Sequence, residues 1–122
     1  MMGDERGSLV AIETQQDLPF ELKRVYYIFG TKEGVERGFH AHKNLQQVAV
    51  AVRGSCTMEL DDGHEKTEVL LNDPTKGLYI GSMTWRVMKN FTEDCVLLVF
   101  ADQHYNENDY IRSYPDFLDI TK

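Results

Sequence analysis

The stretch GVERGFHAHKNLQQVAVAVRG, from Gly34 to Gly54, decides the fold and raises the question of function. His40 and His42 stand one residue apart in a segment that has the composition of a β-strand. Because side chains alternate between the two faces of a strand, both imidazoles are expected to point to the same side. Many metal sites begin with such a pair, and the same pair suits proton transfer, since the unperturbed pKa of histidine lies near neutrality.

The chain as a whole has the size and composition of one globular domain, which we expect to span residues 1–122. Of its 122 residues, 42% are hydrophobic and 27% are charged. No apolar run approaches the roughly 20 residues that span a bilayer, and no secretory signal is expected at the N-terminus. The net charge of −7 disfavours nucleic acid as a partner. Cys56 and Cys95 lie in apolar strand-like segments, which favours reduced, buried thiols and a cytoplasmic location.

Short strand-like segments recur between turn signals along the chain, which predicts an all-β fold of the sandwich or barrel type. The dipeptide Asp62-Gly63 between two apolar segments is a hairpin signal. Strands are expected at 8–13, 23–29, 46–52, 56–60, 67–71, 77–80, 84–88 and 95–101, with a short helical turn within 113–122.

The segment 46–52 alternates between two kinds of side chain. The valines at 48, 50 and 52 share one face, which fits packing of one sheet on another. Gln47, Ala49 and Ala51 share the other face, and their small side chains leave space inside a small barrel. Either large residues from other strands fill that space, or it is kept open for a ligand.

The opening stretch resembles the first sequence motif of the cupins. Its glycines, histidines and amide fall at the spacings of that motif, with glutamine in place of the usual glutamate: Gly34, His40, His42, Gln47 and Gly54. The second cupin motif is weaker, and when it is aligned on Asn90 its histidine position holds Arg86. The resemblance implies a cupin jelly-roll β-barrel.

Two substitutions in this pattern oppose the metal that many cupins bind. Gln47 offers only a neutral amide oxygen, and Arg86 has no lone pair to donate. A guanidinium about 4 Å from a cation also repels it by roughly 4 kcal/mol at an effective dielectric constant of about 20. We therefore expect no metal, with the histidines free for acid–base work and Arg86 suited to an anion or a developing oxyanion. The alternatives are that the histidines are merely hydrogen-bonded interior residues, or that the protein is a metal-dependent cupin oxygenase or isomerase.

Several further stretches resemble one branch of the cupins, the dTDP-sugar 3,4-ketoisomerases of deoxysugar and O-antigen biosynthesis. The resemblance covers residues 4 to 117 and is carried by RGSL from Arg6, KRVYY from Lys23, RGFHAHK from Arg37, DDG from Asp61, GLYI from Gly77 and DYIR from Asp109. It implies conversion of dTDP-4-keto-6-deoxy-D-glucose to a dTDP-3-keto-6-deoxyhexose of either C4 configuration, without metal or organic cofactor. It also implies a homodimer whose subunits exchange their N-terminal strands.

This chemistry needs a base beside C3 and C4 and a group that moves protons on the sugar oxygens. We expect His42 to be the carbon acid–base with His40 beside it, although the pattern allows either order. Tyr27 is the expected oxygen proton relay. Tyr26 competes with it, because adjacent strand residues point to opposite faces and only one can reach the cavity.

The diphosphate of such a substrate requires cations, and arginine matches phosphate oxygens with two parallel hydrogen bonds. Arg37, three residues before His40, is the best placed. Further substrate-binding candidates are Arg6, Arg24, Arg86 and Gln47.

Two other functions fit parts of the same pattern. A dTDP-sugar 3,5-epimerase is also a metal-free cupin that removes protons beside the same ketone, but such chains lack the HAHK sequence. A non-catalytic cupin that binds sugar nucleotides would keep the arginines and would not need the histidine pair.

Overall fold

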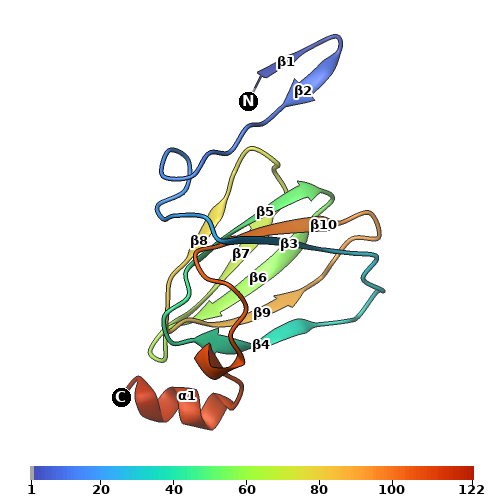
Figure 1. Ribbon diagram of the computed structural model, residues 1–122. Coiled ribbons are helices and arrows are strands. Elements are labelled where there is room, and N and C mark those ends of the chain that lie inside the picture. Colours follow the sequence, from blue (N-terminus) through green and yellow to red (C-terminus); the bar gives the residue numbers. More distant parts are fainter. Residues whose placement is uncertain (1) are drawn as a thin grey trace.

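The computed structural model describes residues 2–122, and side chains from Glu5 onward. Its regular secondary structure consists mainly of antiparallel strands (Figure 1). One sheet has four strands in the order β3-β10-β5-β8, and a second has five in the order β11-β4-β9-β6-β7. Strands β1 and β2 form a separate two-stranded hairpin. The strands are β1 Met2–Asp4, β2 Gly7–Leu9, β3 Arg24–Phe29, β4 Arg37–His42, β5 Gln47–Arg53, β6 Cys56–Asp61, β7 Lys66–Leu71, β8 Leu78–Ile80, β9 Trp85–Lys89, β10 Val96–Ala101 and β11 Tyr110–Ile111.

The two large sheets enclose the main hydrophobic core, to which both contribute. Ala49 of β5 and Leu97 of β10 come from the first sheet, and Met58 of β6 and Met88 of β9 from the second. The small inner face of β5 is thus opposed by long side chains from other strands around Ala49 and Ala51. Cys56 and Cys95 are buried in this core as free thiols.

The valine face of β5 does not pack on the other sheet, so that expectation is wrong. Val48 and Val50 lie on the outer face of their sheet, where Leu18 and Phe20 of the N-terminal segment cover them together with Phe100. The inner side of the same strand is the one that meets the second sheet, because only small residues there leave room for the methionines opposite.

The prediction of a strand over residues 8–13 is also wrong in its extent. Strand β2 ends at Leu9 and pairs only with β1, so residues 10–13 have no neighbouring strand to complete a ladder. The β1–β2 hairpin projects away from both sheets (Figure 1).

The expected turn near the C-terminus is a helix, α1, spanning Tyr114–Ile120. The Ser113 side chain caps it by accepting a hydrogen bond from the Asp116 backbone N–H, and Pro115 stands in its first turn. Phe117 is buried against Trp85 of β9, which holds the helix on the five-stranded sheet. Within residues 2–122, no helix has the length and apolar character needed to cross a membrane.

Candidate active site

A β-bulge in β4 sets the direction of the candidate catalytic side chains. The pairing of β4 with β9 shifts between Gly38 and His40, and both Gly38 (φ 96°) and Phe39 (φ 58°) have left-handed backbone angles. The extra residue breaks strict alternation. Arg37 and His40, which an unbroken strand would place on opposite faces, therefore line the same cavity.

That cavity has a volume of about 350 Å³ and lies between β3 of one sheet and β4 of the other. Three arginines, two tyrosines and one imidazole dominate its wall. The lining residues are Arg24, Tyr26, Ile28, Arg37, Gly38, His40, Met88, Tyr110 and Arg112. A cavity with three cations in its wall suits an anionic ligand.

The two imidazoles lie at different depths. His40 is half-buried at the cavity wall, whereas His42 lies behind it and is 1% exposed. Their ring centroids are 4.9 Å apart, and the ring of Tyr110 lies 5.0 Å from His40 and 4.3 Å from His42. Burial and the charge of Arg86 lower the pKa of His40 to about 4 and that of His42 to about 3. Both rings are therefore neutral near pH 7 and able to accept a proton.

A buried carboxylate stands beside the deeper imidazole. His42 Nδ1 lies 3.3 Å from Asp109 Oδ2. Asp109 also accepts hydrogen bonds from the backbone N–H groups of Asn44, at 2.9 Å, and Leu45, at 3.2 Å. The carboxylate is thus fixed by the turn that follows β4, and it keeps the His42 ring against the start of β11.

A chain of hydrogen bonds runs from a buried cation to the cavity. Arg86, 2% exposed, donates through Nη1 to Gln47 Oε1 and through Nη2 to the Thr84 carbonyl oxygen at 3.0 Å. Gln47 Nε2 in turn donates to Tyr26 Oη at 2.9 Å. The chain ends at a phenol that lines the cavity.

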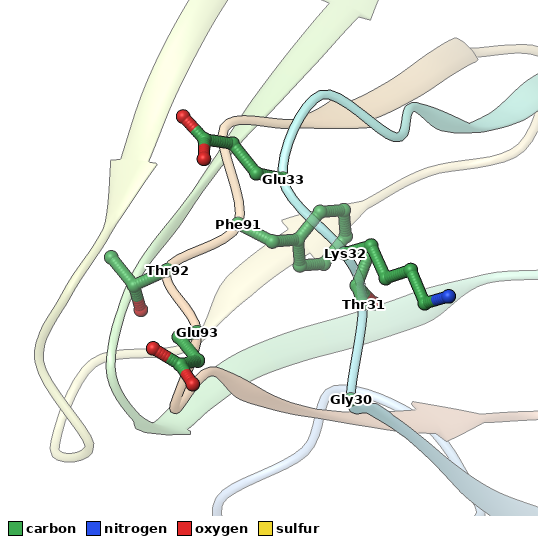
Figure 2. Close-up of a pocket in the computed structure, with 7 residues that line it drawn as sticks. All are labelled: Gly30, Thr31, Lys32, Glu33, Phe91, Thr92 and Glu93. Carbon is green, nitrogen blue, oxygen red and sulfur yellow. The ribbon is translucent and has the colours of Figure 1, made fainter.

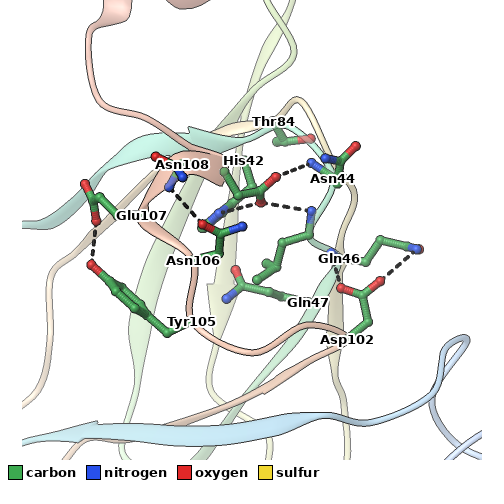
Figure 3. Close-up of polar contacts among 12 residues, drawn as sticks. His42, Asn44, Gln46, Gln47, Thr84, Asp102, Tyr105, Asn106, Glu107 and Asn108 are labelled. Carbon is green, nitrogen blue, oxygen red and sulfur yellow. Dashed lines mark hydrogen bonds and ion pairs between the residues drawn. The ribbon is translucent and has the colours of Figure 1, made fainter.

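The mouth of the cavity carries an exposed ion pair. Arg112 donates to Glu107 through Nε at 2.6 Å and through Nη2 at 2.9 Å, and its guanidinium lies 4.2 Å from the centroid of the Tyr110 ring. Glu107 also accepts from the Tyr105 hydroxyl at 2.5 Å, and these contacts lower its pKa to about 2 (Figure 3). Exposed pairs of this kind contribute little to stability, so Arg112 can exchange Glu107 for an anionic ligand at low cost.

The structure brings most of the expected site residues together. Arg24, Arg37 and His40 line the cavity. His42, Gln47 and Arg86 are buried and do not line this cavity, so direct contact of Gln47 and Arg86 with substrate stays a prediction.

Two expected site residues lie elsewhere. Tyr27 is 61% exposed and pairs with Leu98 on the outer face of its sheet, so its placement in the cavity is wrong and Tyr26 is the tyrosine that lines it. Arg6 lies in the turn between β1 and β2 and does not line this cavity.

Sequence reasoning missed the contribution of the C-terminal region to the site. Tyr110 and Arg112 line the cavity, and Asp109 contacts His42. All three belong to the DYIR stretch, which supported the family resemblance but was given no role. Tyr110 of β11 pairs with His42 of β4, and this pairing brings the DYIR stretch to the site. The two residues lie far apart in the sequence, so the local pattern did not indicate their pairing.

A larger hollow of about 800 Å³ at another part of the surface lacks the groups for this chemistry (Figure 2). Its lining residues are Gly30, Thr31, Lys32, Glu33, Phe91, Thr92 and Glu93. Two carboxylates against one ammonium disfavour a diphosphate, and no imidazole or phenol is available for proton transfer.

The donor set around the histidines does not fit a metal ion. Among the residues that the structure describes, no third His, Cys, Asp or Glu side chain joins the pair in a metal-binding group. Arg86 pairs with His40 across the β4–β9 ladder, and its positive charge acts on both imidazoles, which disfavours a cation beside them.

Comparisons with known proteins agree with this arrangement. The family described as FdtA, WxcM-like, C-terminal matches residues 1–122. A TDP-4-oxo-6-deoxy-alpha-D-glucose-3,4-oxoisomerase from Aneurinibacillus thermoaerophilus is 54% identical over 114 residues, which are 93% of this chain and 82% of the relative. The chain belongs to the 3,4-ketoisomerase family.

Two solved structures of this family extend the similarity to three dimensions. A mutant of the 3,4-ketoisomerase QdtA from Thermoanaerobacterium thermosaccharolyticum, in complex with TDP-4-keto-6-deoxyglucose, is 45% identical with a TM-score of 0.97, covering 98% of this chain and 87% of the other. The TDP-quinovose 3,4-ketoisomerase WlaRB from Campylobacter jejuni is 50% identical with a TM-score of 0.92, covering 97% and 91%.

Proposed function

We propose that this single-domain protein is a sugar-nucleotide 3,4-ketoisomerase that converts dTDP-4-keto-6-deoxy-D-glucose to a dTDP-3-keto-6-deoxyhexose in deoxy-amino-sugar or O-antigen biosynthesis. The observation that carries the proposal is one cavity wall that joins three arginines to a neutral imidazole and a phenol. The arginines suit a nucleoside diphosphate, and the other two groups suit proton transfer on a keto sugar.

The ketone moves by two proton transfers at carbon and two at oxygen. His40 removes the proton from C3, which the neighbouring C4 carbonyl makes acidic, while Tyr26 gives its hydroxyl proton to the C4 oxygen. The product of this step is an enediol. Protonated His40 then returns a proton to C4, the Tyr26 phenolate takes the proton of the C3 hydroxyl, and a C3 ketone results. Both residues end in their starting states and no redox partner is needed.

The order of the two histidines in this proposal reverses our expectation from the sequence. His42 was expected to be the carbon base, but it is 1% exposed and does not line the cavity, whereas His40 does. We therefore assign the proton transfers at C3 and C4 to His40. His42 packs edge-on against the His40 ring and holds it in place, with Asp109 behind it.

The diphosphate is proposed to lie across Arg24, Arg37 and Arg112, which come from three different parts of the chain. Arg24 lies 5.3 Å from the centroid of the Tyr26 ring, so a phosphate held there places the sugar near the phenol. Arg112 leaves Glu107 when the phosphate arrives.

We further propose a cupin jelly-roll in which the two sheets form the walls of the barrel, and a cytoplasmic homodimer that exchanges N-terminal strands. The β1–β2 hairpin, which projects from the sheets (Figure 1), supports the exchange. The exposed apolar residues of β3 support it as well. The buried free thiols of Cys56 and Cys95 suit a reducing compartment.

The decisive experiment incubates the protein with dTDP-4-keto-6-deoxyglucose in D2O, with a chelator present, and follows the ring protons by NMR. The proposal expects a new carbonyl at C3 and deuterium incorporation at C3 and C4. Exchange at C5 would instead identify a 3,5-epimerase. Binding without exchange or turnover would identify a non-catalytic sugar-nucleotide-binding protein.

A further inference from the structure

In the series of hydrogen bonds from Arg86 through Gln47 to Tyr26, each residue donates to the next. Arg86, at the buried end, fixes this order. Arg86 is a guanidinium and carries only donors, so the atom that faces its Nη1 must be an acceptor. Gln47 is the residue it meets, and the Gln47 carbonyl oxygen is therefore turned toward Arg86. Both side chains are 2% exposed, so no bulk water competes for these positions.

The orientation of the amide decides what Tyr26 can do. With its oxygen held by Arg86, Gln47 offers its NH2 group to Tyr26 Oη, at 2.9 Å. The phenol oxygen accepts this hydrogen bond and keeps its own proton. Among the described residues, no group accepts a hydrogen bond from the Tyr26 hydroxyl, and the ring lines the cavity. The proton is thus available to a ligand.

In a second glutamine–tyrosine pair of this protein, the tyrosine donates the hydrogen bond and the glutamine accepts it. Gln46 Nε2 donates to the Asp102 carboxylate at 3.2 Å (Figure 3), and its Oε1 accepts from the Tyr79 hydroxyl at 2.5 Å. An acceptor behind the amide therefore makes the tyrosine donate into the protein. A donor behind the amide, as at Gln47, makes the tyrosine accept.

We infer that Gln47 is a positioning residue that uses its bond to Arg86 to keep the Tyr26 hydroxyl proton directed into the cavity. The inference rests on the proposed ketoisomerase function. The amide N–H also stabilises the phenolate that remains after Tyr26 gives up its proton. In the resting protein, burial raises the pKa of Tyr26, whereas the Gln47 bond and the Arg86 charge act in the opposite direction.

A glutamate at position 47 would reverse the hydrogen bond to Tyr26, so that the tyrosine would donate it. Its carboxylate has acceptors only, so it would pair with Arg86 and also take the Tyr26 proton, turning it away from the cavity. Gln47→Glu should then lower activity, because Tyr26 no longer directs its proton into the cavity. It should not lower stability in parallel, because Arg86 gains a charged partner.

The test compares Gln47→Glu with Gln46→Glu, which makes the same change of charge one residue away on the outer side. Gln47→Glu is expected to lower kcat by on the order of 100-fold, with KM within about threefold of wild type. Gln46→Glu should keep kcat within about twofold. In a Tyr26→Phe background, Gln47→Glu should cause no further loss, because its effect passes through the phenol.

Three results would overturn the inference: wild-type kcat in Gln47→Glu, an equal loss in the Tyr26→Phe background, or a loss of kcat that parallels a loss of thermal stability. A titration of phenolate absorbance, taken as the difference from the matching Tyr26→Phe protein, tests it without turnover. The Tyr26 pKa should be higher in Gln47→Glu than in wild type, and an equal or lower pKa would contradict the inference. If the wild-type protein shows no turnover but the Tyr26 pKa is higher in Gln47→Glu, only the proposed function is rejected. The role of Gln47 in orienting the Tyr26 hydroxyl then stands.

Discussion

The imidazoles of His40 and His42 differ in how closely each approaches the cavity, and this difference can be tested. His40→Asn should lower turnover by on the order of 100- to 10,000-fold, because it removes the group that moves the proton between carbon atoms. The affinity for TDP should stay within about threefold of wild type, since the arginines are untouched. NMR turnover assays and calorimetry measure the two effects. The control His64→Asn, at an exposed hairpin tip, should keep full activity, and an active His40→Asn would reject the assignment.

The lowered pKa values of the same two residues also predict a pH dependence of stability. Both rings have an ordinary pKa of 6.5, lowered in the folded protein to about 4 in His40 and about 3 in His42, by burial and by Arg86. Below pH 6.5 the unfolded chain therefore binds protons that the folded protein refuses, and the free energy of unfolding falls as the pH decreases toward 4.

Urea unfolding at about pH 7 and about pH 5 measures this slope. In His42→Asn the slope should be smaller than in wild type, because one of the two groups that resist protonation is gone. The exposed His64→Asn variant should keep the wild-type slope. An unchanged slope in His42→Asn would show that its ring is not desolvated as the structure indicates.

Strand β4 owes its bulge to a glycine that no other residue can replace without strain. Gly38 has φ 96°, and a Cβ atom there would lie 2.8 Å from the carbonyl oxygen of Arg86 on β9. Gly38→Ala should destabilise the fold by about 1–3 kcal/mol and lower activity, since it disturbs the strand between Arg37 and His40. Gly34→Ala is the matched control: φ is 81°, but its Cβ would meet nothing within 4 Å. Equal urea midpoints for the two variants would show that the close approach to β9 has no effect.

The strands themselves were largely predictable, because alternation and turn residues are local properties of the sequence. The ends of β6 and β10 fell within a residue of their expected positions. Which face of β3 points inward was not predictable, since Tyr26 and Tyr27 are the same residue type and only pairing with β10 separates them. The bulge at Phe39 was hidden for a similar reason. It depends on how β9 pairs with β4, and that contact lies far away in the sequence.

The molecule as a whole presents an apolar face that a single protomer leaves uncovered. Val25, Tyr27 and Phe29 of β3 are exposed on the outside of the four-stranded sheet, with Phe29 at 68%. Burying such a face is the usual function of a homodimer interface. Tyr27→Asp should shift the mass measured by light scattering from dimer to monomer. Leu70→Asp, on exposed β7 of the other sheet, should stay dimeric, and a dimeric Tyr27→Asp would exclude this face.

Exchange of N-terminal strands predicts that one site is built from two chains. Arg6 lies in the β1–β2 hairpin, away from the cavity of its own protomer, so in the proposed dimer it completes the partner's site. Arg6→Ala and His40→Asn proteins should each have low activity alone. Unfolding and refolding them together should restore roughly a quarter of wild-type activity, because half of the re-formed dimers are mixed and each has one intact site. Refolding either variant alone is the control. If the mixture stays as inactive as its components, Arg6 does not act across the interface.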